Sequence, residues 1–284
     1  MKVKLWGTRG SIPSPGEDTV RYGGNTSCVG VTLSDGSLLA LDDEPRRLHI
    51  LLTHLHLDHI QGLVFFAPAF RPQTELVIWG PASPEASLRD RIARYISAPL
   101  SPVEVRELPC DVSFRHCPEA EWEIGPARIR AASVTHRGPT LGYRIDDAGS
   151  SLAYIPDHEP ALGADLGALP EEWISGFELA RDATLLIHDG QYCDEEYPDH
   201  LGWGHSALGD TLRFAHRTGA ERTVLFHHDP THSDERLDQL GAEARQRWVE
   251  LGGTDPGVVT VGAEGGELEL PVKTPQIAEA TAAR

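Results

Sequence analysis

Residues 53–59 read Thr-His-Leu-His-Leu-Asp-His and follow a largely apolar run of the chain. Side chains two residues apart on an extended strand share a face, so His54 and His56 can point to the same side where that strand ends. Asp58 and His59 then lie on the loop that follows. Neutral imidazole and carboxylate groups are suitable ligands for Zn²⁺, Mn²⁺ or Fe. The stretch therefore predicts two neighbouring groups of metal ligands, His54 with His56 and Asp58 with His59.

Four donors cannot complete the coordination of two metal ions, so further ligands must come from distant parts of the chain. Strand ends project side chains to a common rim, and three predicted strands end at a suitable group: His136 after 127–134, Asp157 after 151–155, and His227 or His228 after 222–226. We expect His136 to complete the first cluster, Asp157 to bridge the two ions and His227 to join the second cluster. Strand register alone favours His227 over His228.

The net charge of −18 at pH 7 comes from 25 basic and 43 acidic residues. Such a charge keeps a protein soluble and repels phosphate backbones at long range. The charge therefore argues against a large nucleic-acid substrate. A nucleic acid could still bind at a local patch of basic residues. Bound metal would neutralise part of the negative charge.

The chain of 284 residues is long enough for a substantial core, and no apolar run approaches the roughly 18 residues of a membrane helix. Residues 1–7 are charged and then strand-like, without the apolar stretch of a secretory signal. The four cysteines form no CxxC pair, which disfavours cysteine ligation of zinc. We expect a reduced cytoplasmic protein, with a Cys110–Cys117 disulfide as the alternative.

Hydrophobic patterning predicts alternating strands and helices in one domain over residues 1–272, with a tail at 273–284 that has little to pack. Expected strands are 2–6, 28–33, 37–42, 47–53, 74–79, 102–108, 112–116, 121–124, 127–134, 142–145, 151–155, 183–188, 222–226, 257–261 and 267–270. Expected helices are 84–97, 171–181, 207–217 and 234–251, with a short one starting at 61–63. Ser206 is the predicted N-cap of the helix at 207–217.

The pattern of residues 53–59 followed by His136, Asp157 and His227 resembles the metallo-β-lactamase superfamily. More narrowly, residues 7–13 with 25–27, and 186–189 with 204–207, resemble the branch that contains ribonuclease Z and related phosphodiesterases. The resemblance implies an α/β fold, a four-layer αββα sandwich of two mixed β-sheets flanked by helices. It also implies two divalent metal ions. Zn²⁺ is the expected metal, and Mn²⁺ or Fe are the alternatives.

The resemblance further implies the roles of two catalytic residues. His205 would protonate the leaving group, and Asp189 would set its tautomer. As a separate mechanistic hypothesis, Asp58 would orient the attacking nucleophile besides binding metal. An ordinary polar residue near a helix start is the alternative for His205.

The chain departs from the family pattern immediately before the metal motif. Family members follow the third strand with an Asp-x-Gly turn and a helix, whereas here residues 41–45 pass almost directly into 46–48. An outer helix is therefore expected to be missing. The chain also shows no long Gly/Pro-rich basic insertion of the kind with which ribonuclease Z grips tRNA.

The leading interpretation is a metal-dependent phosphodiesterase acting on a small phosphodiester such as a cyclic nucleotide. The alternatives are a lactonase or thioesterase, a tRNA 3′-processing endonuclease, and a non-hydrolytic sensor or stand-alone redox protein of the same fold. The oligomeric state stays open, a homodimer included.

Overall fold

The computed structural model describes residues 1–39, 47–118 and 120–273. Its larger sheet has seven strands in the order β13-β12-β11-β10-β9-β8-β7. These are β7 (Trp122–Ile124), β8 (Ala127–Ser133), β9 (Leu141–Asp147), β10 (Ser150–Ile155), β11 (Leu185–Asp189), β12 (Thr223–Phe226) and β13 (Val259–Val261). Strands β7 to β10 pair antiparallel, and β10 to β13 pair parallel, so the sheet is mixed. Every residue of β11 and β12 is buried, as expected of central parallel strands covered on both faces.

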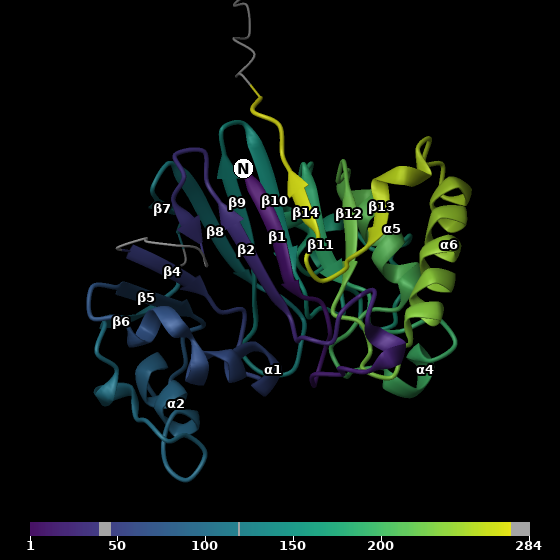
Figure 1. The fold of residues 1–284 in the computed structure, drawn as a ribbon. Helices are drawn as coiled ribbons and strands as arrows, with labels where there is room; N and C mark the ends of the chain where they lie inside the picture. The colour runs from purple at the N-terminus through teal and green to yellow at the C-terminus, as the bar shows by residue number, and fades with distance from the viewer. Residues whose placement is uncertain (40–46, 119, 274–284) are drawn as a thin grey trace, which may run out of the picture.

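A second layer of strands lies in front of this sheet (Figure 1). One part is antiparallel, in the order β14-β1-β2-β3, and the other is parallel, in the order β4-β5-β6. The strands are β1 (Lys2–Gly7), β2 (Cys28–Thr32), β3 (Leu38–Leu39), β14 (Glu267–Glu269), β4 (Arg47–Leu51), β5 (Glu75–Gly80) and β6 (Asp111–His116). Because β14 pairs with β1, both ends of the described chain share one sheet.

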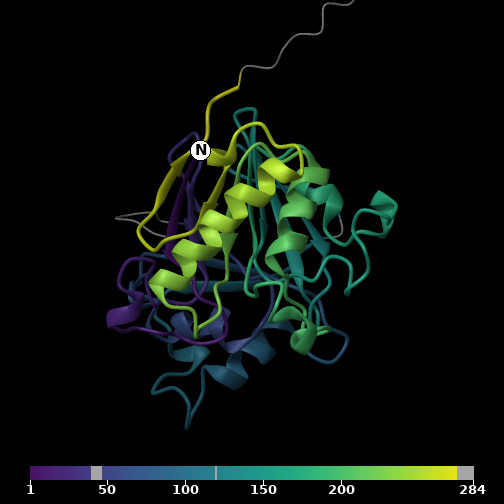
Figure 2. The ribbon, with the colours of Figure 1, turned by 90° about the vertical axis from the view of Figure 1, so that its right-hand side faces the viewer.

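Three apolar clusters hold the layers together. One lies between the two strand layers and includes Leu5, Ile129 and Phe226. A second packs the large sheet against α3 (Phe177–Ala180), α5 (Leu208–Thr218) and α6 (Asp234–Glu250), and Figure 2 shows α6 on the outside of this face. A third packs β4 and β5 against α1 (Leu57–Ile60) and α2 (Leu88–Tyr95). The predicted helix–sheet–sheet–helix sandwich is therefore confirmed.

Short helical turns fill the connections. These are the 3₁₀ helices η1 (Glu17–Thr19), η2 (Gln61–Phe65), η3 (Ala67–Phe70), η4 (Val105–Glu107), η5 (Glu171–Trp173) and η6 (Pro256–Val258), with the one-turn α4 (Tyr197–His200). The strand predicted at 102–108 is wrong, because Glu104 and Glu107 form a capping box around η4 there. The helix predicted at 171–181 is interrupted, because Gly176 adopts a left-handed conformation (φ 71°) between η5 and α3.

Two further expectations around the site are wrong. A helix begins at Leu57 and not at 61, so Asp58 and His59 lie on α1 and not on a loop. Ser206 does not cap α5, whose N-cap is Ala207; its hydroxyl donates instead to the His158 carbonyl. A hydroxyl committed to a buried carbonyl is unavailable to the helix amides.

The shortened connection at 42–47 lies outside the described residues except for Arg47, as does the predicted tail from 274 onward. Lys273, expected to belong to that tail, donates its backbone amide to Ala148 at 2.9 Å. The domain boundary at 272 stays a prediction. All four cysteines are free, so the alternative disulfide is wrong. In the part of the chain that the structure describes, no helix has the length and apolarity needed to span a membrane.

Candidate metal centre

The predicted ligands come from five elements that end at one edge of the sandwich. His54 and His56 follow β4, and Asp58 and His59 lie on α1. The other three, His136, Asp157 and His227, follow β8, β10 and β12. Residues up to 173 positions apart in the chain (His54 to His227) thus meet because strand ends share a rim.

The first group consists of His54, His56 and His136, with ligand atoms within 4.8 Å of one another. His136 Nδ1 lies 2.7 Å from the Gly204 carbonyl and must donate to it, which leaves Nε2 as the lone-pair nitrogen. Burial lowers the pKa of His54 to about 2 and that of His136 to about 4. These imidazoles are therefore held in the neutral form that binds metal.

The second group consists of Asp58, His59, Asp157 and His227. His227 Nε2 lies 3.0 Å from Asp157 Oδ1 and 3.2 Å from Asp58 Oδ2. His59 Nε2 lies 3.1 Å from Asp157 Oδ2 and 3.3 Å from Asp58 Oδ2. Two carboxylates and two imidazoles therefore converge on one buried point.

Asp157 reaches both groups. Its Oδ1 atom is 3.8 Å from His54 Nε2 and 4.0 Å from His136 Nε2, while its other contacts are with the second group. This is the position that a bridging carboxylate needs.

The structure separates His227 from His228. Gln191 Oε1 lies 3.0 Å from His227 Nδ1, which turns His227 Nε2 toward the carboxylates. The His228 ring donates from Nε2 to the Gly262 carbonyl at 2.8 Å and is directed away from the cluster. Only His227 joins the group.

The chemistry of the donor set fits divalent cations. His54 Nε2, His59 Nε2 and Asp157 Oδ2 are buried, and none has a hydrogen-bond partner. His59 Nε2 and Asp157 Oδ2 lie 3.1 Å apart without forming a hydrogen bond. Buried polar atoms of this kind are unfavourable unless something pairs with them.

The charges in the second group agree with this. Burial acts to raise the pKa of Asp58 and of Asp157, but His59 and His227 outweigh it and hold both pKa values below the ordinary range. Burial likewise acts to lower the pKa of His59, but the two carboxylates raise it to about 9. The group therefore demands positive charge, which a metal ion supplies with the neutral imidazoles as ligands.

His205 and Asp189 meet as the resemblance implied. His205 Nδ1 lies 2.7 Å from Asp189 Oδ2. Asp189 is fully buried and also accepts from the amides of His158, Gln191 and Ser206. A carboxylate surrounded by donors fixes the His205 tautomer, with Nδ1–H toward Asp189 and Nε2 free. The His205 ring centroid is 4.8 Å from that of His136 and 4.9 Å from that of His227.

Sequence reasoning missed the support given by the N-terminal loop. The Ser11 amide donates to Asp58 Oδ2 at 2.9 Å, and Arg9 donates to the carbonyls of Gly23, Asp229 and His232. A Cβ atom on Gly10 would lie 2.4 Å from His227 Nδ1. The Gly-Thr-Arg-Gly-Ser run was the available signal, but only the fold shows that it contacts two ligands.

Glu159 is a second missed residue. Its buried carboxylate accepts from Tyr197 Oη at 2.7 Å and from the amides of Gly202 and Gly204 at 2.9 and 2.8 Å. It ties the segment after Asp157 to the loop that precedes His205. Its place two residues after Asp157 was visible in the sequence, but its partners were not.

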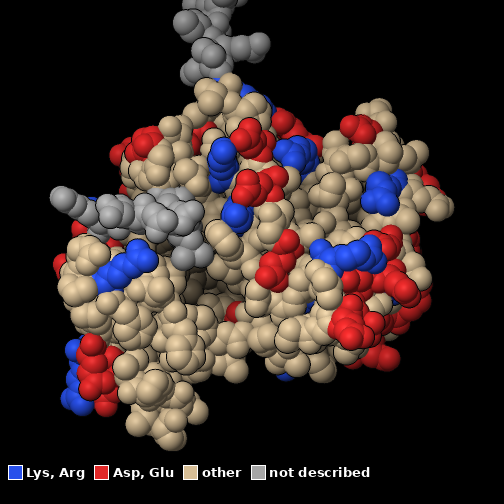
Figure 3. Space-filling model, viewed as in Figure 1, with Lys and Arg blue, Asp and Glu red and all other residues tan. Residues whose placement is uncertain are grey.

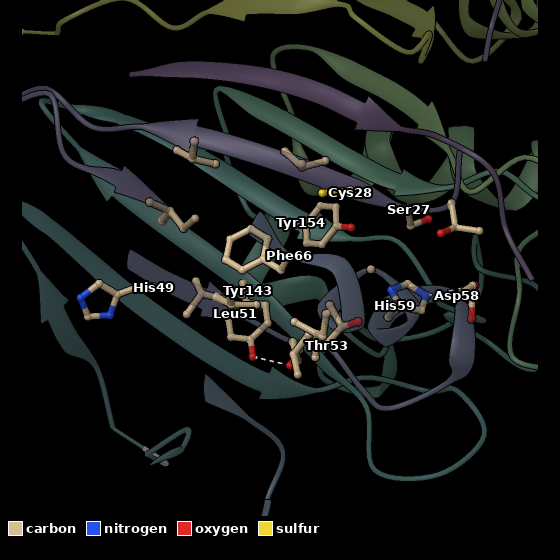
Figure 4. A pocket seen from close by; sticks show the side chains of 18 of the residues that line it. Ser27, Cys28, His49, Leu51, Thr53, Asp58, His59, Phe66, Tyr143 and Tyr154 are labelled. Atoms are coloured by element: carbon tan, nitrogen blue, oxygen red, sulfur yellow. Dashed lines mark hydrogen bonds and ion pairs between the residues drawn. The ribbon is translucent and has the colours of Figure 1, made fainter. Parts of the chain in front are cut away.

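An apolar cavity of about 230 Å³ lies between the strand layers behind Asp58 and His59. Figure 4 shows these two residues at one end and His49 at the other, with Phe66 and Tyr154 between. Tyr143 closes one wall by donating to the Leu52 carbonyl at 2.7 Å. The carboxylate of Asp58 thus borders an apolar interior.

Residues 36–228 match the family described as the beta-lactamase superfamily domain. A ribonuclease Z from Mycobacterium sp. (strain KMS) is 30% identical over 232 residues, covering 72% of this chain and 74% of the relative. Two solved structures share the fold. Human tRNase Z, short form, is 21% identical with a TM-score of 0.63 over 95% of this chain and 100% of its own. A diphosphatase from the PhnP family is 18% identical with a TM-score of 0.64 over 95% and 98%.

The family match covers more than half of the chain and includes every predicted ligand from His54 to His227. The chain is therefore a metallo-hydrolase of the beta-lactamase superfamily, in the branch of ribonuclease Z and related phosphodiesterases.

Proposed function

We propose that this metallo-hydrolase is a phosphodiesterase with a dinuclear centre, acting on a small phosphodiester such as a cyclic nucleotide. His54, His56 and His136 would hold one ion and Asp58, His59 and His227 the other, with Asp157 in reach of both groups. When bound, such ions supply Lewis acidity toward phosphate oxygens and an activated water. Zn²⁺ suits this set of imidazoles and carboxylates, with Mn²⁺ and Fe as alternatives.

The His205–Asp189 pair is the observation that carries the proposal. An alkoxide leaving group needs a proton, and His205 Nε2 is free to deliver one beside the His136 and Asp157 ligand atoms. Asp189 holds the His205 ring through Nδ1–H, which leaves Nε2 for this proton transfer. Asp58, which accepts from the Ser11 amide, would orient the attacking water.

The surface charge supports a small substrate. The chain carries a net charge of −18, and Figure 3 shows Asp and Glu side chains gathered on the right of one face, the side where α6 lies. A long polyanion would be repelled, whereas a single phosphodiester needs only the metal ions for its charge.

A second candidate is tRNA 3′ processing, which the relatives named ribonuclease Z favour. The same His205–Asp189 pair would serve it, because the leaving group there is also an alkoxide. The two candidates differ in substrate size, and an assay separates them directly.

The test uses the chain reconstituted with Zn²⁺ or Mn²⁺ and four substrates: bis(p-nitrophenyl) phosphate, cyclic nucleotides, a pre-tRNA and an acyl-lactone. We expect phosphodiester turnover that falls roughly 100-fold in His56→Ala. His205→Ala should reduce hydrolysis of the cyclic nucleotide strongly and that of bis(p-nitrophenyl) phosphate much less, because p-nitrophenolate leaves without a proton. Lactone hydrolysis indifferent to His205→Ala, without phosphodiester turnover, would overturn the proposal. Cleavage of pre-tRNA alone would replace it by the second candidate.

A further inference from the structure

A row of aromatic rings leads from the metal centre to the surface. The Tyr192 ring lies 6.0 Å from that of His205, measured between centroids. His200 stacks on Tyr192 at 4.2 Å, and Trp203 meets His200 edge to face at 5.0 Å. The Trp203 side of the row ends in solvent, with 50% of the residue exposed. A large indole is thus presented at the rim of the candidate active site.

The backbone on both sides of Trp203 is fixed to the metal centre. The amides of Gly202 and Gly204 donate to the buried Glu159 carboxylate, and the Gly204 carbonyl accepts from His136 Nδ1. Gly204 has a φ of 90°, and a Cβ atom there would lie 2.4 Å from His136 Nδ1. The exposed indole therefore belongs to a tethered segment, since the amides on both sides of it are bonded to Glu159 and the Gly204 carbonyl to His136.

An exposed arginine accompanies the indole. Arg137 directly follows His136, and its guanidinium carbon lies 5.9 Å from the Trp203 ring centroid. Its Nε donates to the Gly202 carbonyl at 3.2 Å, and its terminal nitrogens make no hydrogen bond to the described residues. Across the described residues, no carboxylate comes within the 4.0 Å ion-pair distance of this guanidinium. An unpaired cation beside a metal centre, in a chain of net charge −18, is suited to an anionic ligand.

We propose that Trp203 and Arg137 form a subsite for the nucleoside side of the phosphodiester. The base stacks on the Trp203 indole, and the Arg137 guanidinium pairs with an oxygen of the phosphate or its flanking group. The proposal rests on the function proposed above and narrows it to nucleotide esters, either free nucleotides or the end of an RNA. A planar base covers the exposed ring, and every base has a face that can stack.

The test compares two chromogenic esters that share one leaving group, thymidine 5′-(p-nitrophenyl phosphate) and methyl p-nitrophenyl phosphate. The measured quantity is the ratio of their kcat/KM values, because a loss of general activity cancels in it. We expect Trp203→Ala to lower the ratio by roughly 10- to 100-fold, as loss of one base stack predicts, and Trp203→Phe to restore most of it. Trp173→Ala is the control, because Trp173 is an exposed tryptophan on η5. Arg137→Ala should raise KM for both esters more than it lowers kcat.

Binding of AMP to the metal-loaded chain gives a readout that needs no turnover. AMP should quench tryptophan fluorescence in the wild type and in Trp173→Ala, and not in Trp203→Phe. An ester ratio that is unchanged in Trp203→Ala, together with AMP quenching that is unchanged in Trp203→Phe, would overturn the subsite. AMP binding that depends on Trp203, without hydrolysis of any phosphodiester, would instead reject the proposed function and keep the subsite. Comparing cyclic AMP with a short RNA then identifies the source of the nucleoside.

Discussion

The two halves of the metal centre differ in charge and exposure. His54, His56 and His136 form a neutral group in which His56 is exposed to solvent. The Asp58 group contains two buried carboxylates, and its imidazoles are drawn toward the charged form. The two carboxylates of the Asp58 group attract a cation electrostatically, and the three neutral imidazoles of the other group do not. From this comparison we expect two unequal sites, of which the carboxylate group binds its ion more tightly.

Removing the shared carboxylate should have the largest effect. Asp157→Ala takes from both groups the oxygen atoms that approach them within 4.0 Å. We expect loss of both ions and a fall in kcat of at least about 1000-fold, because the charge that holds the cations and aligns both halves is gone. Metal analysis and steady-state kinetics check this, with the exposed Asp18→Ala as the matched control. Retention of two ions per chain would contradict the bridging role.

Single histidine variants should distinguish the halves. His56→Ala, on the neutral side, should leave about one ion per chain and lower kcat by roughly 100-fold. His59→Ala, on the carboxylate side, should weaken binding of the ion that the wild-type chain releases last. Titration with a chelator gives the order of release. Equal affinities of the two sites for the ion in the wild type would contradict the expected difference between them.

Glu159 should have a smaller effect, because it acts through the loop and contacts no ligand atom. Glu159→Ala releases the amides of Gly202 and Gly204, so we expect kcat to fall about 10-fold on a cyclic nucleotide with both ions retained. Glu159→Gln keeps one acceptor oxygen and should recover part of the activity. Loss of metal in Glu159→Gln would show that the residue maintains the ligands themselves.

The smallest effect concerns stability, in chelator-treated chain. His136 has its pKa lowered to about 4, so the unfolded chain binds its proton more readily and stability should rise from pH 4 to about 6.5. His59 has its pKa raised to about 9, so its contribution is complete below about pH 6.5 and lost as the pH rises through 9. Each shift corresponds to about 3 kcal/mol at most. Urea midpoints between pH 4.5 and 9.5 should therefore pass through a maximum near pH 6.5, and metal should remove the decline on the alkaline side.

The sequence could predict which candidate ligands the fold brings together, because strand ends and residue types are local signals. His54, His136 and Asp157 each follow a recognisable apolar strand, and a common rim follows from the topology of a sandwich. The helix around Asp58 escaped prediction because its single turn is too short for any periodic pattern. Short 3₁₀ turns such as η4 were missed for the same reason.

The contacts that position the candidate ligands could not be predicted from the sequence, because they join segments that are distant in the chain. Ser11 meets Asp58 across 47 positions, and Glu159 meets Gly204 across 45. Nothing in either local sequence encodes the partner. The choice of His227 over His228 was likewise decided by Gln191 and Gly262, which only the folded chain places beside those two rings.

The central claim is that the protein hydrolyses a phosphodiester and needs two metal ions at this centre to do so. Titrating Zn²⁺ into metal-free chain while following cyclic AMP hydrolysis tests it most directly. We predict that two equivalents bind per chain, the first with little turnover and the second with most of it. Full activity at one equivalent, or two bound equivalents without hydrolysis of any phosphodiester, would contradict the account.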